Sequence, residues 1–144
     1  MANGGPWLDT ATYAAHVDRS QASRDATEVL RRALAGDQEE VAGTFGAVVR
    51  REGVDGAYDV AWCLAATTVG DLAYGGWTLD FPDIEHADYE SRWVARFLCA
   101  YANSDVATGQ ALFRSAETDG HLRACLLTLA GSAAATLRYR RDPP

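Results

Sequence analysis

The sequence predicts an all-α protein, a compact bundle of six or seven short helices. Three observations lead to this prediction. Apolar residues recur at the i, i+3, i+4, i+7 spacing of a helix along most of the chain. Alanine and arginine, two strong helix formers, are abundant. No segment combines β-branched residues with the strict alternation of a strand, so no sheet is expected.

Two helices are expected before the first strong stop signal. A short helix follows Asp9, which is placed to be its N-cap. Ser20 or Ser23 opens a second helix with a clear apolar stripe, and Gly36 ends it. The hydroxyl and carboxyl side chains at these positions suit the exposed N–H groups of a helix start, and they therefore set the expected boundaries.

The next two helices are also marked by their ends. Asp37 and Glu40 form a variant capping box at the start of the third helix, which stops at Gly53. Asp55 opens a fourth helix, which glycines 75 and 76 end. Because this helix is apolar on most sides, it is expected to lie at the centre of the bundle.

Three more helices follow an irregular stretch at 75–85. The fifth runs over about 86–102, and the sixth begins after Ser104 and ends near Gly120. The last, over 121–139, has the clearest apolar spacing in the chain. It is therefore expected to close the bundle.

Two further groups of residues have a structural interpretation, the first through the helix dipole and the second through helix packing. Arg138, Arg140 and Arg141 lie at the end of the last helix, where they suit the negative C-terminal end of its dipole. Gly43 and Gly46 interrupt the third helix. Each glycine costs about 1 kcal/mol relative to alanine, so another helix is expected to approach closely at this point.

A weak internal similarity suggests two related halves, 20–74 and 88–140. Each half would be a unit of three helices, and the two units would pack face to face. A shift of 68 residues aligns Ser23 with Ser91, Leu30 with Leu98, Asp37 with Asp105, Phe45 with Phe113 and, after a one-residue gap, Gly53 with Gly120.

Composition limits the class of protein. Its 144 residues, 48% hydrophobic and 23% charged, suit a single globular domain over 1–144. All 13 basic residues are arginine, and 20 acidic residues bring the net charge to −7, which disfavours binding to nucleic acid or anionic membranes. No apolar run is long enough to span a bilayer and the N-terminus does not resemble a signal peptide, so a cytoplasmic location is expected.

The sequence holds no recognised catalytic motif. It has no P-loop, HExxH or GxSxG pattern, and without lysine it cannot use Schiff-base chemistry. His16, His86 and His121 could converge on a divalent metal, but surface or capping roles are preferred for all three. No metal and no cofactor is therefore expected, no catalytic residue is identified, and a non-enzymatic role is favoured.

The three cysteines give no sign of a catalytic role either. Cys63, Cys99 and Cys125 are odd in number, form no CxxC pair and each lies within an apolar stretch. Free, buried and inert thiols are expected, because thiolate activation needs a positive environment that these positions lack.

The segment 52–91 is the best candidate for a functional surface, since it is rich in acidic and aromatic residues and holds no arginine. A protein-interaction or regulatory module that uses residues 74–93 to bind a protein partner or a second copy is preferred. The alternative is a small-molecule-binding protein or accessory enzyme, with a bundle pocket around His86 and nearby carboxylates for a cationic or aromatic ligand. These aromatic rings could instead anchor the long loop to the core. The candidate residues are Tyr74, Trp77, Phe81, Glu85, His86, Tyr89 and Trp93.

Overall fold

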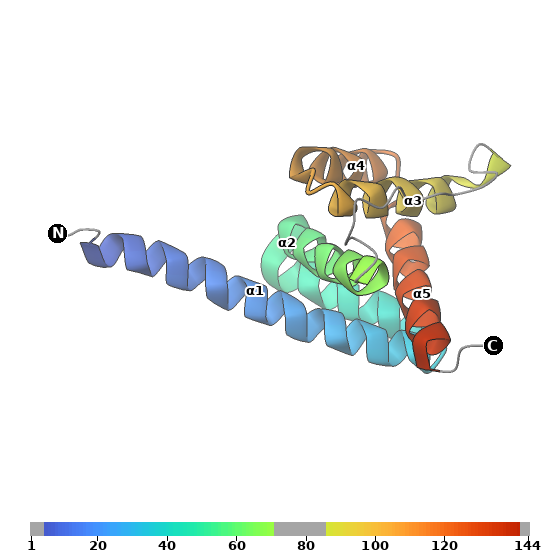
Figure 1. Cartoon of the computed structure of the whole chain (residues 1–144), viewed down its shortest axis with the longest axis horizontal. Coiled ribbons are helices and arrows are strands. Elements are labelled where there is room, and N and C mark those ends of the chain that lie inside the picture. The colour runs from blue at the N-terminus through green and yellow to red at the C-terminus, as the bar shows by residue number, and fades with distance from the viewer. Residues whose placement is uncertain (1–4, 71–85, 142–144) are drawn as a thin grey trace.

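The structure, a computed structural model, describes the backbone of residues 5–70 and 86–141 and the side chains of 20–70 and 86–140. The described residues form five α-helices and no strand (Figure 1). The all-α prediction is thus confirmed, but the predicted count of six or seven helices is wrong. The helices are α1 (Gly5–Leu34), α2 (Gln38–Val69), α3 (Tyr89–Ala102), α4 (Val106–Thr118) and α5 (Leu122–Arg141).

The first two predicted helices are one continuous helix, α1, of 30 residues. The expected break at Ser20 or Ser23 does not occur, because residues 7–35 contain no glycine or proline that would interrupt a helix. The carbonyl oxygen of Ser23 accepts a hydrogen bond from the Thr27 hydroxyl at 3.0 Å, one helical turn further on. Ser23 is therefore an interior residue of α1 and caps nothing.

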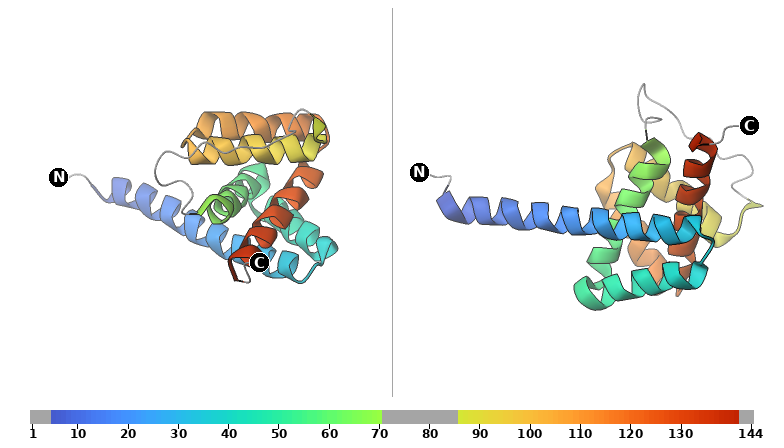
Figure 2. Two further views of the ribbon diagram at one scale, coloured as in Figure 1. Left: turned by 45° about the vertical axis from the view of Figure 1, so that its right-hand side comes forward. Right: turned by 90° about the horizontal axis from the view of Figure 1, so that it is seen from below.

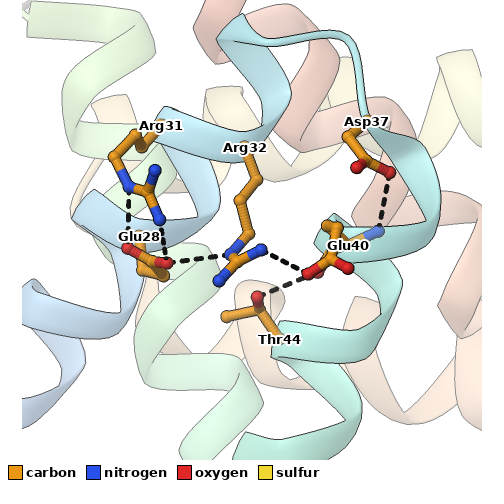
Figure 3. Close-up of polar contacts among 6 residues, drawn as sticks. All are labelled: Glu28, Arg31, Arg32, Asp37, Glu40 and Thr44. Carbon is orange, nitrogen blue, oxygen red and sulfur yellow. Dashed lines mark hydrogen bonds and ion pairs between the residues drawn. The ribbon is translucent and has the colours of Figure 1, made fainter.

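The turn between α1 and α2 begins as predicted. Gly36 has a φ of 78°, which a side chain would disfavour, and Asp37 is the N-cap of α2. The carboxylate of Asp37 accepts a hydrogen bond from the backbone N–H of Glu40 at 3.1 Å. The Glu40 side chain contacts Arg32 of α1, and Arg32 also donates to Glu28 at 2.8 Å (Figure 3). Glu40 thus ties two helices together.

Helix α2 comprises the third and fourth predicted helices, joined across a sharp bend. Gly53, where a stop was expected, has φ 79° and ψ −174°, so the chain changes direction there and continues as a helix (Figure 2). The helix ends at Val69, before the predicted end at 75–76, because Gly70 adopts a φ of 51° and serves as its C-cap. The half after Gly53 is deeply buried, and Leu64 is fully inaccessible to solvent.

The start of α3 lies three residues later than predicted. Asp88 is the N-cap, and its carboxylate accepts a hydrogen bond from the Ser91 N–H at 2.9 Å. Hydrogen bonding from Ser91 holds the pKa of Asp88 below its usual value. His86 precedes the helix and is exposed.

Helix α4 is capped by Asp105 rather than by Ser104. The Asp105 carboxylate accepts hydrogen bonds from the hydroxyl and the backbone N–H of Thr108, at 2.6 and 3.1 Å, which lower its pKa. Ser104 precedes it with a positive φ of 54° and so belongs to the turn. Both residues can cap a helix in principle, and here the backbone conformation decides between them.

The suggested repeat has counterparts in these helix ends. Asp37 and Asp105, which the 68-residue shift aligns, are both N-caps that accept a hydrogen bond from the third residue after them. Gly53 and Gly120, aligned after the gap, have φ values of 79° and 76°. Similar helix starts and breaks also arise independently from the same local rules, so duplication stays a prediction.

Helix α5 is the hub of the bundle. It packs against each of the other four helices, and α3 and α4 lie side by side across one end of the assembly (Figures 1 and 2). One buried cluster draws side chains from all five helices. Its fully buried members include Val29 of α1, Leu64 of α2, Phe97 of α3 and Leu129 of α5.

Arginines at the end of α5 stabilise the ends of other helices. The Arg138 guanidinium donates a 2.7 Å hydrogen bond to the carbonyl oxygen of Leu34, in the last turn of α1. Arg140 donates to the carbonyl oxygen of Thr67 in α2 at 3.1 Å and also covers Gly70. The sequence pattern favoured interaction with the dipole of α5 itself, whereas the observed hydrogen bonds cap α1 and α2.

An aromatic cluster joins α2, α3 and α4. Trp93 stacks on Phe97 at a centroid distance of 4.8 Å, and Trp62 and Tyr58 meet Phe97 edge-on at 5.7 and 6.1 Å. Phe113 of α4 meets Tyr58 edge-on at 5.5 Å. Such edge and stacked pairs add to the free energy of burial, so the cluster holds the α3–α4 pair on α2.

Tyr58→Phe is expected to raise the free energy of unfolding by about 1 kcal/mol, because the Tyr58 hydroxyl is buried among the described residues without a hydrogen-bond partner. Burial also raises the pKa of this hydroxyl. Urea denaturation followed by circular dichroism measures the change. Tyr101→Phe, which removes a hydroxyl that is not buried in this way, is the control and should change little. A clear loss of stability in Tyr58→Phe would instead show that a bound water satisfies the hydroxyl.

Candidate functional site

The structure covers only part of the surface proposed from the sequence. Tyr74, Trp77, Phe81 and Glu85 lie outside the described residues. The remaining three, His86, Tyr89 and Trp93, differ sharply in their surroundings.

Trp93 belongs to the core. It is 4% exposed, and its indole N–H donates a 2.9 Å hydrogen bond to the carbonyl oxygen of Leu112 in α4. Its ring is stacked on Phe97. Both the apolar ring and the polar N–H are thus already engaged within the chain.

Tyr89 takes part in a polar contact between α3 and the turn that joins α4 to α5. Its hydroxyl donates a 2.8 Å hydrogen bond to Asp119, and its ring stacks on the His121 imidazole at a centroid distance of 4.2 Å. Nδ1 of His121 lies 3.3 Å from the Glu90 carboxylate. Burial and the hydrogen bond to Asp119 raise the pKa of Tyr89. Every side chain of this cluster has a partner, which indicates a structural contact.

The described residues hold no group of three or more histidine, cysteine or acidic side chains that could bind a metal ion. The His16 side chain lies outside the described part. Cys125 is fully buried, and burial raises the pKa of its thiol to about 12. Burial also raises the pKa of Cys63 and of Cys99. All three thiols are therefore protonated at neutral pH and poorly nucleophilic.

A prominent hollow of the described surface lies elsewhere, between the first half of α2 and the start of α5. It is an open groove with a volume of about 670 Å³, here called the α2/α5 groove. Phe45 and Val49 of α2 and Leu122, Leu126 and Leu127 of α5 supply most of its apolar lining. Phe45 and Leu126 also belong to the buried core, so the groove reaches the core from outside.

Two glycines open the α2 side of this groove. A Cβ atom added to Gly43 would have no heavy atom within 4 Å, and one added to Gly46 would meet only the Arg50 guanidinium at 3.4 Å. The close helix approach expected at these glycines is therefore not made by any described part of the chain. At Gly43 and Gly46 the backbone of α2 is instead left without a side chain of its own and without a neighbouring described helix over it.

Three charged side chains complete the lining, namely Glu39, Arg50 and Arg123. All three are exposed, and none makes a hydrogen bond or ion pair with another described residue. Elsewhere in the bundle, Arg32 and Arg51 each bind two carboxylates. The groove thus has an apolar centre and one more positive than negative charge at its edge.

Sequence reasoning missed this groove because its two sides are about 75 residues apart along the chain. The one local signal was the pair Gly43 and Gly46. Their cost in helix stability led to the expectation that another helix approaches α2 there.

No protein-family model, curated protein or solved structure matches the chain. Among the described residues, no helix has the length and apolar character needed to cross a membrane.

Proposed function

We propose that this chain is a protein-interaction module that binds an acidic amphipathic helix in the α2/α5 groove. The observation that carries the proposal is the groove itself, an open apolar hollow of about 670 Å³ edged by arginines that have no partner among the described residues. The surface at 74–93, proposed from the sequence, has most of its candidate residues outside the described part. The α2/α5 groove, rather than the surface at 74–93, is therefore the interaction surface that we propose.

Shape favours a helix as the occupant. The groove runs between two helices, and Gly43 allows the backbone of a third helix to come close to α2. Apolar residues on both sides, such as Val49 and Leu127, offer contacts for side chains at i, i+3, i+4 and i+7 of a bound helix. Burying those side chains would supply the main favourable free energy.

Charge favours an acidic helix. Arg50 and Arg123 are free to bind carboxylates beside the apolar stripe of the occupant, and guanidinium groups bind carboxylates through paired hydrogen bonds. Only Glu39 opposes them in the lining. This local excess of positive charge stands out in a chain whose net charge is −7.

The alternative function, binding of a small molecule, is favoured by one observation. The groove volume lies within the range of about 300–1,000 Å³ that is typical of ligand sites. An aliphatic carboxylate would match the apolar lining and the arginines. The open form of the groove and its lack of uncharged polar side chains favour the helix.

The test is selection of binders from a displayed library of amphipathic helical peptides, followed by affinity measurement on groove variants. Gly43→Gln places a long polar side chain in the groove and is expected to weaken binding about tenfold or more. Gly131→Gln is the matched control. Gly131 is also an exposed helical glycine with no atom within 4 Å of an added Cβ, but it lies outside the groove.

Three results would contradict the proposal. Selection could yield no helical binder, the binders could tolerate Gly43→Gln as well as Gly131→Gln, or basic helices could bind better than acidic ones. Decanoate serves as a small-molecule probe. If decanoate binds the unaltered chain but not Gly43→Gln, and no peptide binds, the groove is assigned to a small molecule.

A further inference from the structure

We infer that the helix that fills the α2/α5 groove is the first part of α1, residues 5–18, from a second copy of this chain. The inference rests on the proposed function and names its partner. It predicts self-association in which each copy provides both a groove and a helix.

The first observation is that α1 extends well beyond the other four helices. Figures 1 and 2 show its first part leading away from them in all three views. The helix starts at Gly5, and the first buried residue among its described side chains is Ala22. The 14 residues of the segment span about 21 Å. A helix of this length is only marginally stable in water unless something packs against it.

The second observation is that this segment cannot reach the groove of its own chain. Residues 7–35 contain no glycine or proline, and α1 is continuous over Gly5–Leu34. The second part of α1 is fixed in the core through Ala26 and Val29, so the first part must follow the same axis outward. Only a second molecule can bring a groove to it.

The third observation is complementary charge. Residues 5–18 contain Asp9 and Asp18 and no arginine. The groove carries Arg50 and Arg123 against a single glutamate. Opposite charges flanking an apolar contact favour this pairing and disfavour a groove-to-groove contact, in which the arginines would repel one another.

The fourth observation is the apolar pattern of the segment. Leu8, Ala11 and Ala15 follow the i, i+3, i+7 spacing of a helix that binds in a groove. Small residues at two of the three positions suit a close approach to the open backbone at Gly43. Each copy has both a groove and a segment 5–18. In a closed pair, each segment therefore binds the groove of the other copy, and the contact is made twice.

The experiment is sedimentation equilibrium of the full chain and its variants. The full chain is expected to have twice its mass of 15.5 kDa. Leu8→Asp changes the segment, and Gly43→Gln changes the groove. Each is expected to raise the dimer dissociation constant about tenfold or more, while Gly131→Gln leaves it unchanged. Residue 8 is in the first turn of α1, and the first part of this helix leads away from the bundle (Figure 1), so circular dichroism should show that Leu8→Asp keeps the fold.

Charge reversal gives an independent readout. Arg50→Glu with Arg123→Glu should weaken the dimer, and adding Asp9→Arg with Asp18→Arg should restore it. A rescue of this kind requires that the segment and the groove meet, because a merely structural loss would not be repaired by changing the other partner.

A monomeric full chain, or a dimer insensitive to both Leu8→Asp and Gly43→Gln, would overturn the inference. The proposed function is tested separately with the library-selected acidic helix. If that helix binds the groove of a monomeric full chain, the interaction module stands without self-association. If no acidic helix binds either the full chain or Leu8→Asp, in which the second copy's helix no longer competes for the groove, the proposed function fails. The inference that rests on it then fails as well.

Discussion

Phe97→Ala is expected to lower the free energy of unfolding by about 3–5 kcal/mol, which would make it the most damaging single substitution in the aromatic cluster. Phe97 is fully buried, and its ring is the common neighbour of Trp93, Trp62, Tyr58 and Phe113. Truncation removes the ring and leaves a cavity between α2, α3 and α4. Rigid aromatic neighbours cannot collapse into that space as aliphatic side chains do, so most of the cavity should remain.

A loss of this size is a large part of the stability of a domain, which is typically about 5–15 kcal/mol. Urea denaturation followed by circular dichroism in the far ultraviolet measures it. Phe97→Leu, which keeps most of the buried volume, is the control and should cost less than half as much. A loss below about 1 kcal/mol in Phe97→Ala would mean that this ring does not hold the three helices together.

Gly109→Ala is expected to be the next most damaging change, with a loss of about 2 kcal/mol. Gly109 lies within α4, where alanine would normally gain about 1 kcal/mol in helix propensity. A Cβ atom there would lie 2.8 Å from the Trp62 ring and 3.0 Å from the Tyr58 hydroxyl. Both rings are held in the aromatic cluster, so α4 itself would have to move away from α2.

The matched control is Gly131→Ala. Gly131 is also helical, and an added Cβ would meet no atom within 4 Å, so only the gain in helix propensity should be seen. The two substitutions are chemically identical and should change the urea midpoint in opposite directions. Equal stabilisation by both would contradict the close packing of α4 against Trp62.

Much of the local structure could be predicted from the sequence because helix ends depend on nearby residues. Asp37 caps α2, Gly36 ends α1 and the last helix follows its apolar stripe, all as expected. Two of the errors occurred where two neighbours were equally suitable or where a good cap stood inside a helix. Ser104 and Asp105 are adjacent caps, and Ser23 could cap a helix but lies in the middle of one.

The candidate site could be predicted far less well. Tyr89 and Trp93 were expected on one surface, yet Trp93 is buried against Phe97 while Tyr89 stacks on His121. Trp93 also donates its indole N–H to the carbonyl oxygen of Leu112 in α4, and His121 lies in the turn before α5, so both contacts join segments that are far apart in the sequence and that no local pattern connects. The same holds for Arg140, whose hydrogen bond to Thr67 joins helix ends that are far apart in the sequence.

The sequence by itself determined the helical class, several helix ends and the apolar surroundings that raise the pKa of the three cysteines. These follow from periodicity, from capping and from apolar neighbours, which are properties of short segments. Only the tertiary structure decided how the six or seven predicted helices became five and where the α2/α5 groove lies. The reason is physical: the α2/α5 groove is lined by Phe45 and Leu126, which come from segments far apart in the sequence, and no described helix of the same chain covers the two glycines on its α2 side.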